Sequence, residues 1–229
     1  MVAGQETQFG NITALIGDPI RSMVLWTLLD GRAYTATELA ICADTSPQNI
    51  SMHLSKLVQA DLLTVESQGR HRYYRFSRQE VAYAIEALAN LISPKNEVKE
   101  ASTGISDVKY CRTCYDHLAG RVGVLITEKL ISQKVIELQN KTYNLTVKGN
   151  KFFKDFGIDI NELENKRRFF AKPCLDWSER KYHLSGSLGA ALLDEMLRLD
   201  WMRRKRNSRA VIITSKGQSE IYNKFKLSI

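Results

Sequence analysis

The chain has 229 residues, which allows one large domain or two small ones, and its composition is that of an ordinary globular protein. Hydrophobic residues make up 44% and charged residues 25%, so a core can form without disulfides. The net charge of +8 favours an acidic partner, which is DNA, RNA or an anionic membrane surface. Because the chain shows neither an apolar run of membrane-spanning length nor a signal peptide, we expect a cytoplasmic protein with reduced cysteines and no membrane partner.

The first sixty residues contain three helix starts that are marked by capping residues. Asp18-Pro19 predicts a helix that ends near Gly31, and the capping-box spacing of Thr35 and Glu38 predicts a short second helix. After a turn, Ser46-Pro47 predicts a third helix that runs to about residue 60, with an apolar stripe on one face. The close spacing of the second and third helices is typical of a helix-turn-helix.

A β-hairpin is predicted directly after the third helix. Residues 62–66 and 70–76 read as paired strands around a turn at 67–69, and a capping box at residue 77 predicts a helix over 78–92. The order of helix, helix-turn-helix, hairpin and helix predicts a winged helix-turn-helix domain over residues 1–92. Residues 93–106 lack periodicity and are interpreted as a linker.

Residues 107–229 contain an internal repeat. The pattern His-Leu-x-Gly-x-x-Gly occurs at 117–123 and again at 183–189, and Thr-x-Lys-Gly occurs at 146–149 and 214–217. In each copy a Leu-rich helix precedes a strand pair, and the paired glycines suggest that helices approach closely. We therefore predict a mainly α chain with small β-hairpins, in the α+β class, whose second domain is a pseudo-duplicated, winged-helix-like regulatory unit.

The third helix and the hairpin carry side chains that suit DNA. Gln and Asn can read adenine in the major groove, Ser and His can reach base edges or phosphates, and cations on a hairpin tip suit the phosphate backbone. A basic hairpin can also be a solvated turn, but its place directly after a helix-turn-helix favours DNA contact. The predicted DNA-contacting residues are Ser46, Pro47, Gln48, Asn49, Ser51, His53, Lys56, Arg70, His71 and Arg72.

These motifs resemble those of ArsR-type repressors. The matching segments are Leu15–Arg21, Glu38–Ala40, Ile50–Leu57 and Gly69–Phe76, and the resemblance covers roughly residues 10–92. It implies a homodimer that binds an inverted-repeat operator in double-stranded DNA and represses transcription until an effector binds. Metal-sensing members carry Cys-x-Cys before the helix-turn-helix, whereas this chain has Thr35 and Thr37 there, so an arsenic or cadmium site of that type is not expected.

A second group of candidate ligands lies in residues 107–229, in segments that resemble those of long ArsR-like regulators with an extra C-terminal domain. Three interpretations stay open: a soft-metal site for zinc or cadmium, a thiol that senses oxidants, or small buried cysteines and structural histidines with no cofactor. The effector is therefore a small molecule, a metal ion or an oxidant. The candidate residues are Cys111, Cys114, His117, Cys174, Asp176 and His183.

Other classes of function are less well supported. The sequence lacks a P-loop, a Rossmann fingerprint, HExxH and GxSxG, so we do not expect an enzyme. A protein that binds nucleic acid without sequence preference remains the alternative, and it would show a steep dependence on salt with little specificity. The sequence predicts a sequence-specific transcriptional regulator.

Overall fold

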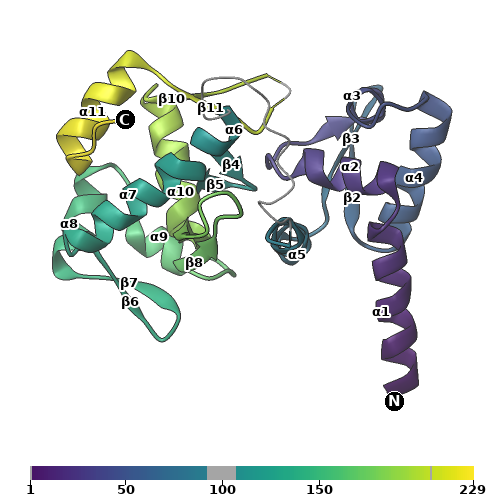
Figure 1. Cartoon of the computed structure of the whole chain (residues 1–229), viewed down its shortest axis with the longest axis horizontal. Helices are drawn as coiled ribbons and strands as arrows, with labels where there is room; N and C mark the ends of the chain where they lie inside the picture. The colour runs from purple at the N-terminus through teal and green to yellow at the C-terminus, as the bar shows by residue number, and fades with distance from the viewer. Residues whose placement is uncertain (1, 92–106, 207) are drawn as a thin grey trace. The chain divides into compact units, whose positions relative to one another are not determined.

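The structure is a computed structural model that describes residues 2–91, 107–206 and 208–229, and it divides into two compact units, Met1–Leu88 and Ala89–Ile229 (Figure 1). The predicted linker, 93–106, lies outside the described residues. Within the described ranges, no helix is both long and apolar enough to cross a membrane.

The first unit has the predicted order of helix, helix-turn-helix, hairpin and helix. Its elements are α1 (Val2–Ile16), α2 (Pro19–Leu28), β1 (Tyr34–Thr35), α3 (Ala36–Cys42), α4 (Pro47–Gln59), β2 (Leu63–Gln68), β3 (His71–Phe76) and α5 (Gln79–Ala89). The strand order is β1-β3-β2, with antiparallel pairing throughout. The capping residues act as predicted: the backbone N–H groups of Arg21 and Asn49 donate to Asp18 and Ser46, and Thr35 forms the capping box with Glu38.

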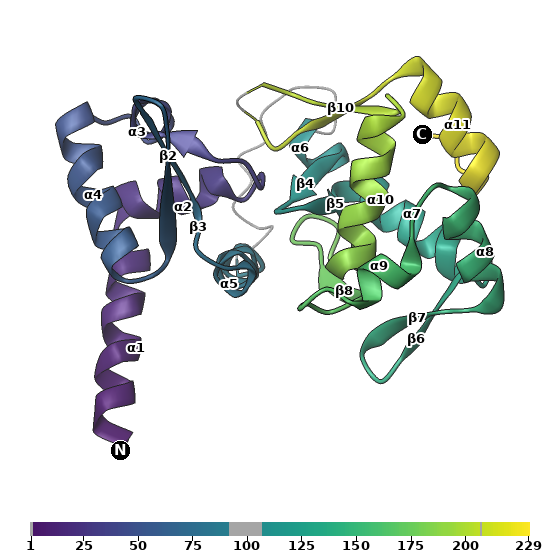
Figure 2. The same cartoon turned by 180° about the vertical axis from the view of Figure 1, so that it is seen from behind.

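Three details of this unit differ from the sequence prediction. Helix α1, which extends away from the rest of the unit in Figures 1 and 2, was not predicted, because its residues 2–16 show little apolar periodicity. Strand β1 adds a third strand beside the hairpin. The hydroxyl of Ser77 donates to the carbonyl of Asp61, whereas the predicted capping box would have it accept from the N–H groups of α5.

The core of the first unit lies where α2, α3 and α4 meet the sheet. The completely buried side chains on α4 repeat at helical spacing, as the apolar stripe predicted. They leave the opposite face of α4 to solvent, which positions that face for contact with a partner. The fully buried core residues of the three helices are Val24, Leu25, Leu28, Leu39, Ile50, Leu54 and Leu57.

The second unit contains the same series of elements twice, after the short helix α6 (Asp107–Tyr110). The first copy is β4 (Arg112–Cys114), β5 (His117–Ala119), α7 (Gly120–Ser132), β6 (Ile136–Gln139), β7 (Thr142–Leu145) and α8 (Val147–Asp155). After α9 (Ile160–Glu164), the second copy is β8 (Lys172–Leu175), β9 (Tyr182–Ser185), α10 (Gly186–Arg198), β10 (Met202–Arg204), β11 (Val211–Ile213) and α11 (Ser215–Phe225). Each copy thus keeps a helix, a hairpin and a helix, and adds a strand pair in front that the sequence did not reveal.

One of the two recurring motifs caps a helix, and the other allows a helix to pack closely on a strand. In Thr-x-Lys-Gly, the Thr146 and Thr214 hydroxyls cap α8 and α11 by accepting from the N–H groups of Gly149 and Gly217. In His-Leu-x-Gly-x-x-Gly, the last glycine lets a helix approach the strand before it: a Cβ on Gly189 would lie 2.5 Å from the carbonyl oxygen of Leu184. The predicted close helix–helix approach occurs at Gly120, where a Cβ would lie 2.7 Å from the Lys109 carbonyl oxygen of α6. It is wrong for the last glycine of the motif, whose close neighbour is the preceding strand.

Candidate DNA interface and candidate metal centre

The exposed face of α4 and the adjoining hairpin form the first candidate site. On α4, the side chains of Gln48, Ser51 and Lys56 are exposed, as are Ser46 and Pro47 at its start. The N-terminal N–H groups of a helix favour an anion, so the beginning of α4 is suited to a phosphate. At the hairpin, Arg70, His71 and Arg72 are all exposed, around the β2–β3 turn.

Two of the predicted DNA-contacting residues are placed differently. Asn49 is half-buried, and its amide donates to the Thr45 hydroxyl at 2.9 Å, which holds the side chain within the domain. His53 is only 6% exposed, so its assignment to a base contact is wrong. Its Nδ1 lies 3.3 Å from Asp18 and 3.4 Å from the Arg21 guanidinium, and the histidine therefore braces α4 against the start of α2.

The buried Arg21 extends this brace to α1. Its guanidinium donates to the carbonyls of Leu15 and Ala14, at 2.6 and 3.2 Å, near the end of α1. The backbone N–H of Arg21 holds the pKa of Asp18 below its ordinary value. A network of three charged or polar side chains thus fixes the orientation of α4 relative to α1 and α2.

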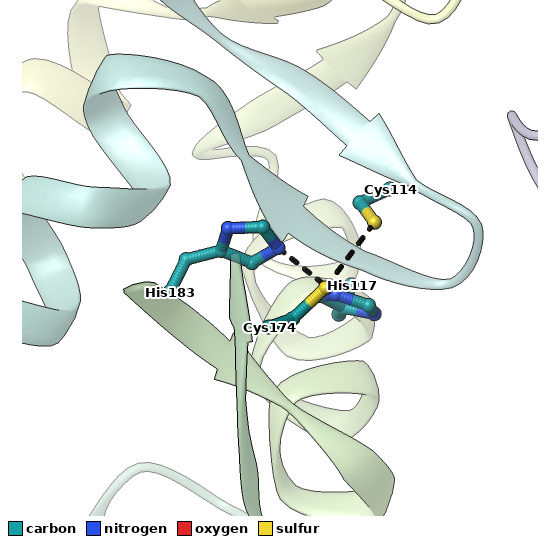
Figure 3. Close-up of side chains that lie close together, drawn as sticks. All are labelled: Cys114, His117, Cys174 and His183. Carbon is teal, nitrogen blue, oxygen red and sulfur yellow. Dashed lines mark hydrogen bonds between the residues drawn. The ribbon is translucent and has the colours of Figure 1, made fainter. Parts of the chain in front are cut away.

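The second candidate site is a cluster of two cysteines and two histidines in the second unit. The candidate ligand atoms of Cys114, His117, Cys174 and His183 all lie within 4.8 Å of one another. Figure 3 shows the four side chains converging from two hairpins. The Sγ atoms of the cysteines are 3.8 Å apart, and the Nε2 atoms of the histidines are 3.1 Å apart.

The hairpin register explains why these four residues meet. Cys114 is the cross-strand partner of His117 in β4–β5, and Cys174 is the partner of His183 in β8–β9. Each repeat therefore contributes one cysteine and one histidine. Three of the four residues are buried, and Cys174 is half-buried.

Each histidine of the cluster faces a carboxylate on its other ring nitrogen. Nδ1 of His117 lies 3.2 Å from Asp116, and Nδ1 of His183 lies 3.5 Å from Asp176. Each carboxylate is in turn paired with an arginine, Asp116 with Arg168 at 2.6 Å and Asp176 with Arg112 at 2.9 Å. These aspartates and arginines surround the cluster without being part of it.

The electrostatic environment keeps these groups charged in spite of burial. Burial opposes the charged form of His117, but the neighbouring Cys114 and Asp116 outweigh it and raise the pKa to about 9. Burial also raises the pKa of Asp176, yet the charges of Arg112 and His183 hold it well below its ordinary value. Asp116 has a lowered pKa because His117 and Arg168 outweigh its burial.

Two members of the predicted ligand set are not in the cluster. Cys111 belongs to the hydrophobic core and is not among the converging ligand atoms, and burial raises the pKa of its thiol to about 12. Asp176 faces His183 but is held by Arg112 and by the N–H of Gly120 at 2.7 Å. Asp116, Arg112 and Arg168 were missed; only the position of Asp116 beside His117 could have indicated its role.

Comparison with known proteins places the chain in a family. A model described as "Helix-turn-helix domain" matches residues 16–66. The HTH-type transcriptional regulator YdfF of Bacillus subtilis (strain 168) is 45% identical over 209 residues, which cover 90% of this chain and 92% of YdfF. The chain belongs to the HTH-type transcriptional regulators. The predicted helix-turn-helix transcriptional regulator is thus confirmed.

Solved structures match the regulator over about two fifths of its length. One is the homodimeric winged helix-turn-helix DNA-binding domain of Mb0332 from Mycobacterium bovis, a possible ArsR-family regulator, with 21% identity, a TM-score of 0.35 and coverage of 39% of this chain and 81% of that one. Another is the transcriptional repressor BigR from Xylella fastidiosa, with 19% identity, a TM-score of 0.36 and coverage of 40% and 92%.

Proposed function

We propose that the regulator is a repressor that binds an inverted-repeat operator as a homodimer and is released when an effector reaches its second unit. The observation that carries the DNA-binding part is the exposed polar start of α4 beside a basic hairpin. Gln48 is exposed at the start of α4, where it can reach base edges, and Arg70 and Arg72 can hold the flanking backbone. The resemblance to ArsR-type repressors supports repression rather than activation of transcription.

The dimer is proposed from apolar side chains that the first unit leaves in solvent. Phe9 on α1 is 70% exposed, and Leu88 on α5 is 43% exposed. Large apolar side chains exposed on α1 and α5 are suited to an interface between two copies of the chain. We expect Leu88→Glu to shift the mass seen by sedimentation from dimer to monomer, whereas an unchanged mass would contradict this assignment.

The test of sequence-specific binding is fluorescence anisotropy on DNA from upstream of the regulator's own gene and on a scrambled duplex. We expect the upstream DNA to bind more tightly by several kcal/mol, roughly 4–10 in known systems. Gln48→Ala should reduce this preference by about 1–3 kcal/mol, because it removes a base contact. Arg72→Ala should weaken binding to both duplexes and lower the slope of log affinity against log salt by about 1.

Arg167→Ala is the matched control, since Arg167 is an exposed arginine in the second unit and its loss changes the net charge equally. It should leave both affinity and slope nearly unchanged. Equal affinity of the wild type for both duplexes would contradict the proposal and favour a protein that binds nucleic acid without sequence preference. An unchanged salt slope in Arg72→Ala would show that the hairpin does not contact DNA.

A further inference from the structure

We propose that Cys114, His117, Cys174 and His183 together bind one divalent metal ion of the soft or borderline class, such as Zn²⁺ or Cd²⁺. The site lies where the two repeats of the second unit meet, because each repeat supplies one thiol and one imidazole. The proposal deepens the proposed function by naming the chemical class of its effector, and in that respect it rests on that function.

The distances match tetrahedral coordination. Zinc binds sulfur at about 2.3 Å and nitrogen at about 2.0–2.1 Å, which places two sulfurs about 3.8 Å apart and two nitrogens about 3.3–3.4 Å apart in a tetrahedron. The sulfurs of Cys114 and Cys174 are 3.8 Å apart, and the Nε2 atoms of His117 and His183 are 3.1 Å apart. Small adjustments of the side chains therefore suffice to enclose an ion.

The carboxylates around the cluster orient the histidines as ligands. Nδ1 of His117 lies 3.2 Å from Asp116 and Nδ1 of His183 lies 3.5 Å from Asp176, so the Nε2 atoms of both rings point inward at each other. Two lone pairs at 3.1 Å repel unless a proton or a cation lies between them. Metal-bound histidines commonly have a carboxylate on their second nitrogen, so this pairing at both rings favours a metal ion.

Charge balance favours a divalent ion. The negative charge of Asp116 is matched by Arg168, and that of Asp176 is matched by Arg112. On binding, the ion displaces the protons of the two thiols and of the charged His117 ring. The two thiolates and two neutral imidazoles that result carry a charge of −2, which a divalent cation neutralises. Because a net charge in a buried site is costly, a monovalent ion fits this set less well.

The ligand set also indicates what the ion does. Four protein ligands complete a tetrahedral site and leave no position for substrate, which is typical of structural rather than catalytic zinc. Since the ligands come from both repeats, the binding energy of the ion stabilises the contact between β5 and β9. Cys174 is the half-buried ligand, so it marks the side from which an ion can enter.

The test starts from the full chain, reduced and treated with a chelator. Titration with Co²⁺ should saturate at one ion per chain, with the visible bands of tetrahedral cobalt and the charge-transfer band of a cobalt–thiolate bond. Added Zn²⁺ should displace the cobalt and abolish these bands. Cys114→Ser and Cys174→Ser should each lose the charge-transfer intensity in part and weaken binding at least tenfold, whereas Cys111→Ala should bind as the wild type does.

Asp116→Ala keeps all four ligands and provides a second test if the cysteine variants do not fold. Because it removes the carboxylate that faces His117 and pairs with Arg168, but none of the ligands, we expect about 10–100-fold weaker binding. Wild-type affinity in Cys114→Ser and Cys174→Ser, or cobalt bands without a thiolate contribution, would overturn the proposal. So would a wild-type chain that forms a Cys114–Cys174 disulfide under mild oxidation but takes up no metal after reduction.

The metal-binding measurements do not involve DNA. A negative result for the metal site would therefore leave the DNA-binding proposal standing, and the reverse is also true. Anisotropy on the upstream duplex is then measured with and without one equivalent of Zn²⁺. A change of at least tenfold in affinity that Cys174→Ser abolishes supports the ion as effector. Stoichiometric binding with unchanged DNA affinity would retain the site and overturn its role as effector.

Discussion

The same substitution, glycine to alanine, should have opposite effects at two helical positions of this regulator. A Cβ on Gly189 of α10 would lie 2.5 Å from the carbonyl oxygen of Leu184 and 3.3 Å from Cβ of His117. Side-chain carbons do not approach a backbone oxygen so closely, so α10 must move away from β9. Forced overpacking of this kind typically costs about 1–3 kcal/mol. A Cβ on Gly10 of α1 would meet nothing within 4 Å, and Gly10→Ala should stabilise by about 0.5–1 kcal/mol.

Urea unfolding of the metal-free chain, followed by circular dichroism and tryptophan fluorescence, checks both expectations. Gly189→Ala should lower the midpoint of the transition that reports the second unit, and it should also weaken metal binding, because β9 carries His183. Gly10→Ala should leave that transition unchanged and slightly raise the helical signal of the first unit. An unchanged midpoint in Gly189→Ala, or a shift of the same sign in both variants, would refute the close packing of α10 on β9.

Four further predictions follow from single contacts. Ser46→Ala should destabilise the first unit by about 1 kcal/mol in thermal unfolding, because it removes the cap of α4. His53→Ala should cost the first unit about 1–3 kcal/mol, since it empties a buried position and removes the contacts of the ring with Asp18 and Arg21. The lowered pKa of Asp176 means that its stabilisation is present above about pH 4 and is lost on acidification, so urea midpoints measured against pH should fall less steeply in Asp176→Asn. Arg168→Met should weaken cobalt binding roughly tenfold, because it frees the carboxylate that orients a ligand.

The first unit could be predicted from the sequence because its information is local. Asp18, Thr35 and Ser46 each mark a helix start that the structure confirms, and the apolar stripe of α4 fixes which face is buried. Ser77 shows the limit of this reasoning: it has the spacing of a capping residue, but its hydroxyl donates to Asp61. A competing acceptor brought near by the fold cannot be recognised from local spacing. For the same reason, the burial of His53 against Asp18 could not be foreseen.

The strand pairs that carry the metal ligands were missed because they are short, with three or four residues in each strand. The strands β4 and β5 have three residues each, all of them buried, so they show no alternation of polar and apolar residues. Without these strands, Cys111 and Cys114 were read as a pair because of their spacing. In the hairpin, the turn at residues 115–116 instead sets Cys114 opposite His117 and leaves Cys111 in the core.

The duplication accounts for a site that neither repeat can form alone, since one cysteine and one histidine do not enclose an ion. The positions of the two carboxylates indicate that the arrangement serves to orient the histidines, and that it is more than packing copied by the duplication. Asp116 comes from the two-residue turn of the first hairpin, whereas Asp176 follows β8 in the much longer connection of the second. These positions are not equivalent in the two repeats, yet each aspartate faces the Nδ1 of the histidine of its own hairpin and pairs with an arginine. Packing alone does not require two non-equivalent carboxylates to reach the same ring nitrogen, but two histidines that must present Nε2 to one cation do.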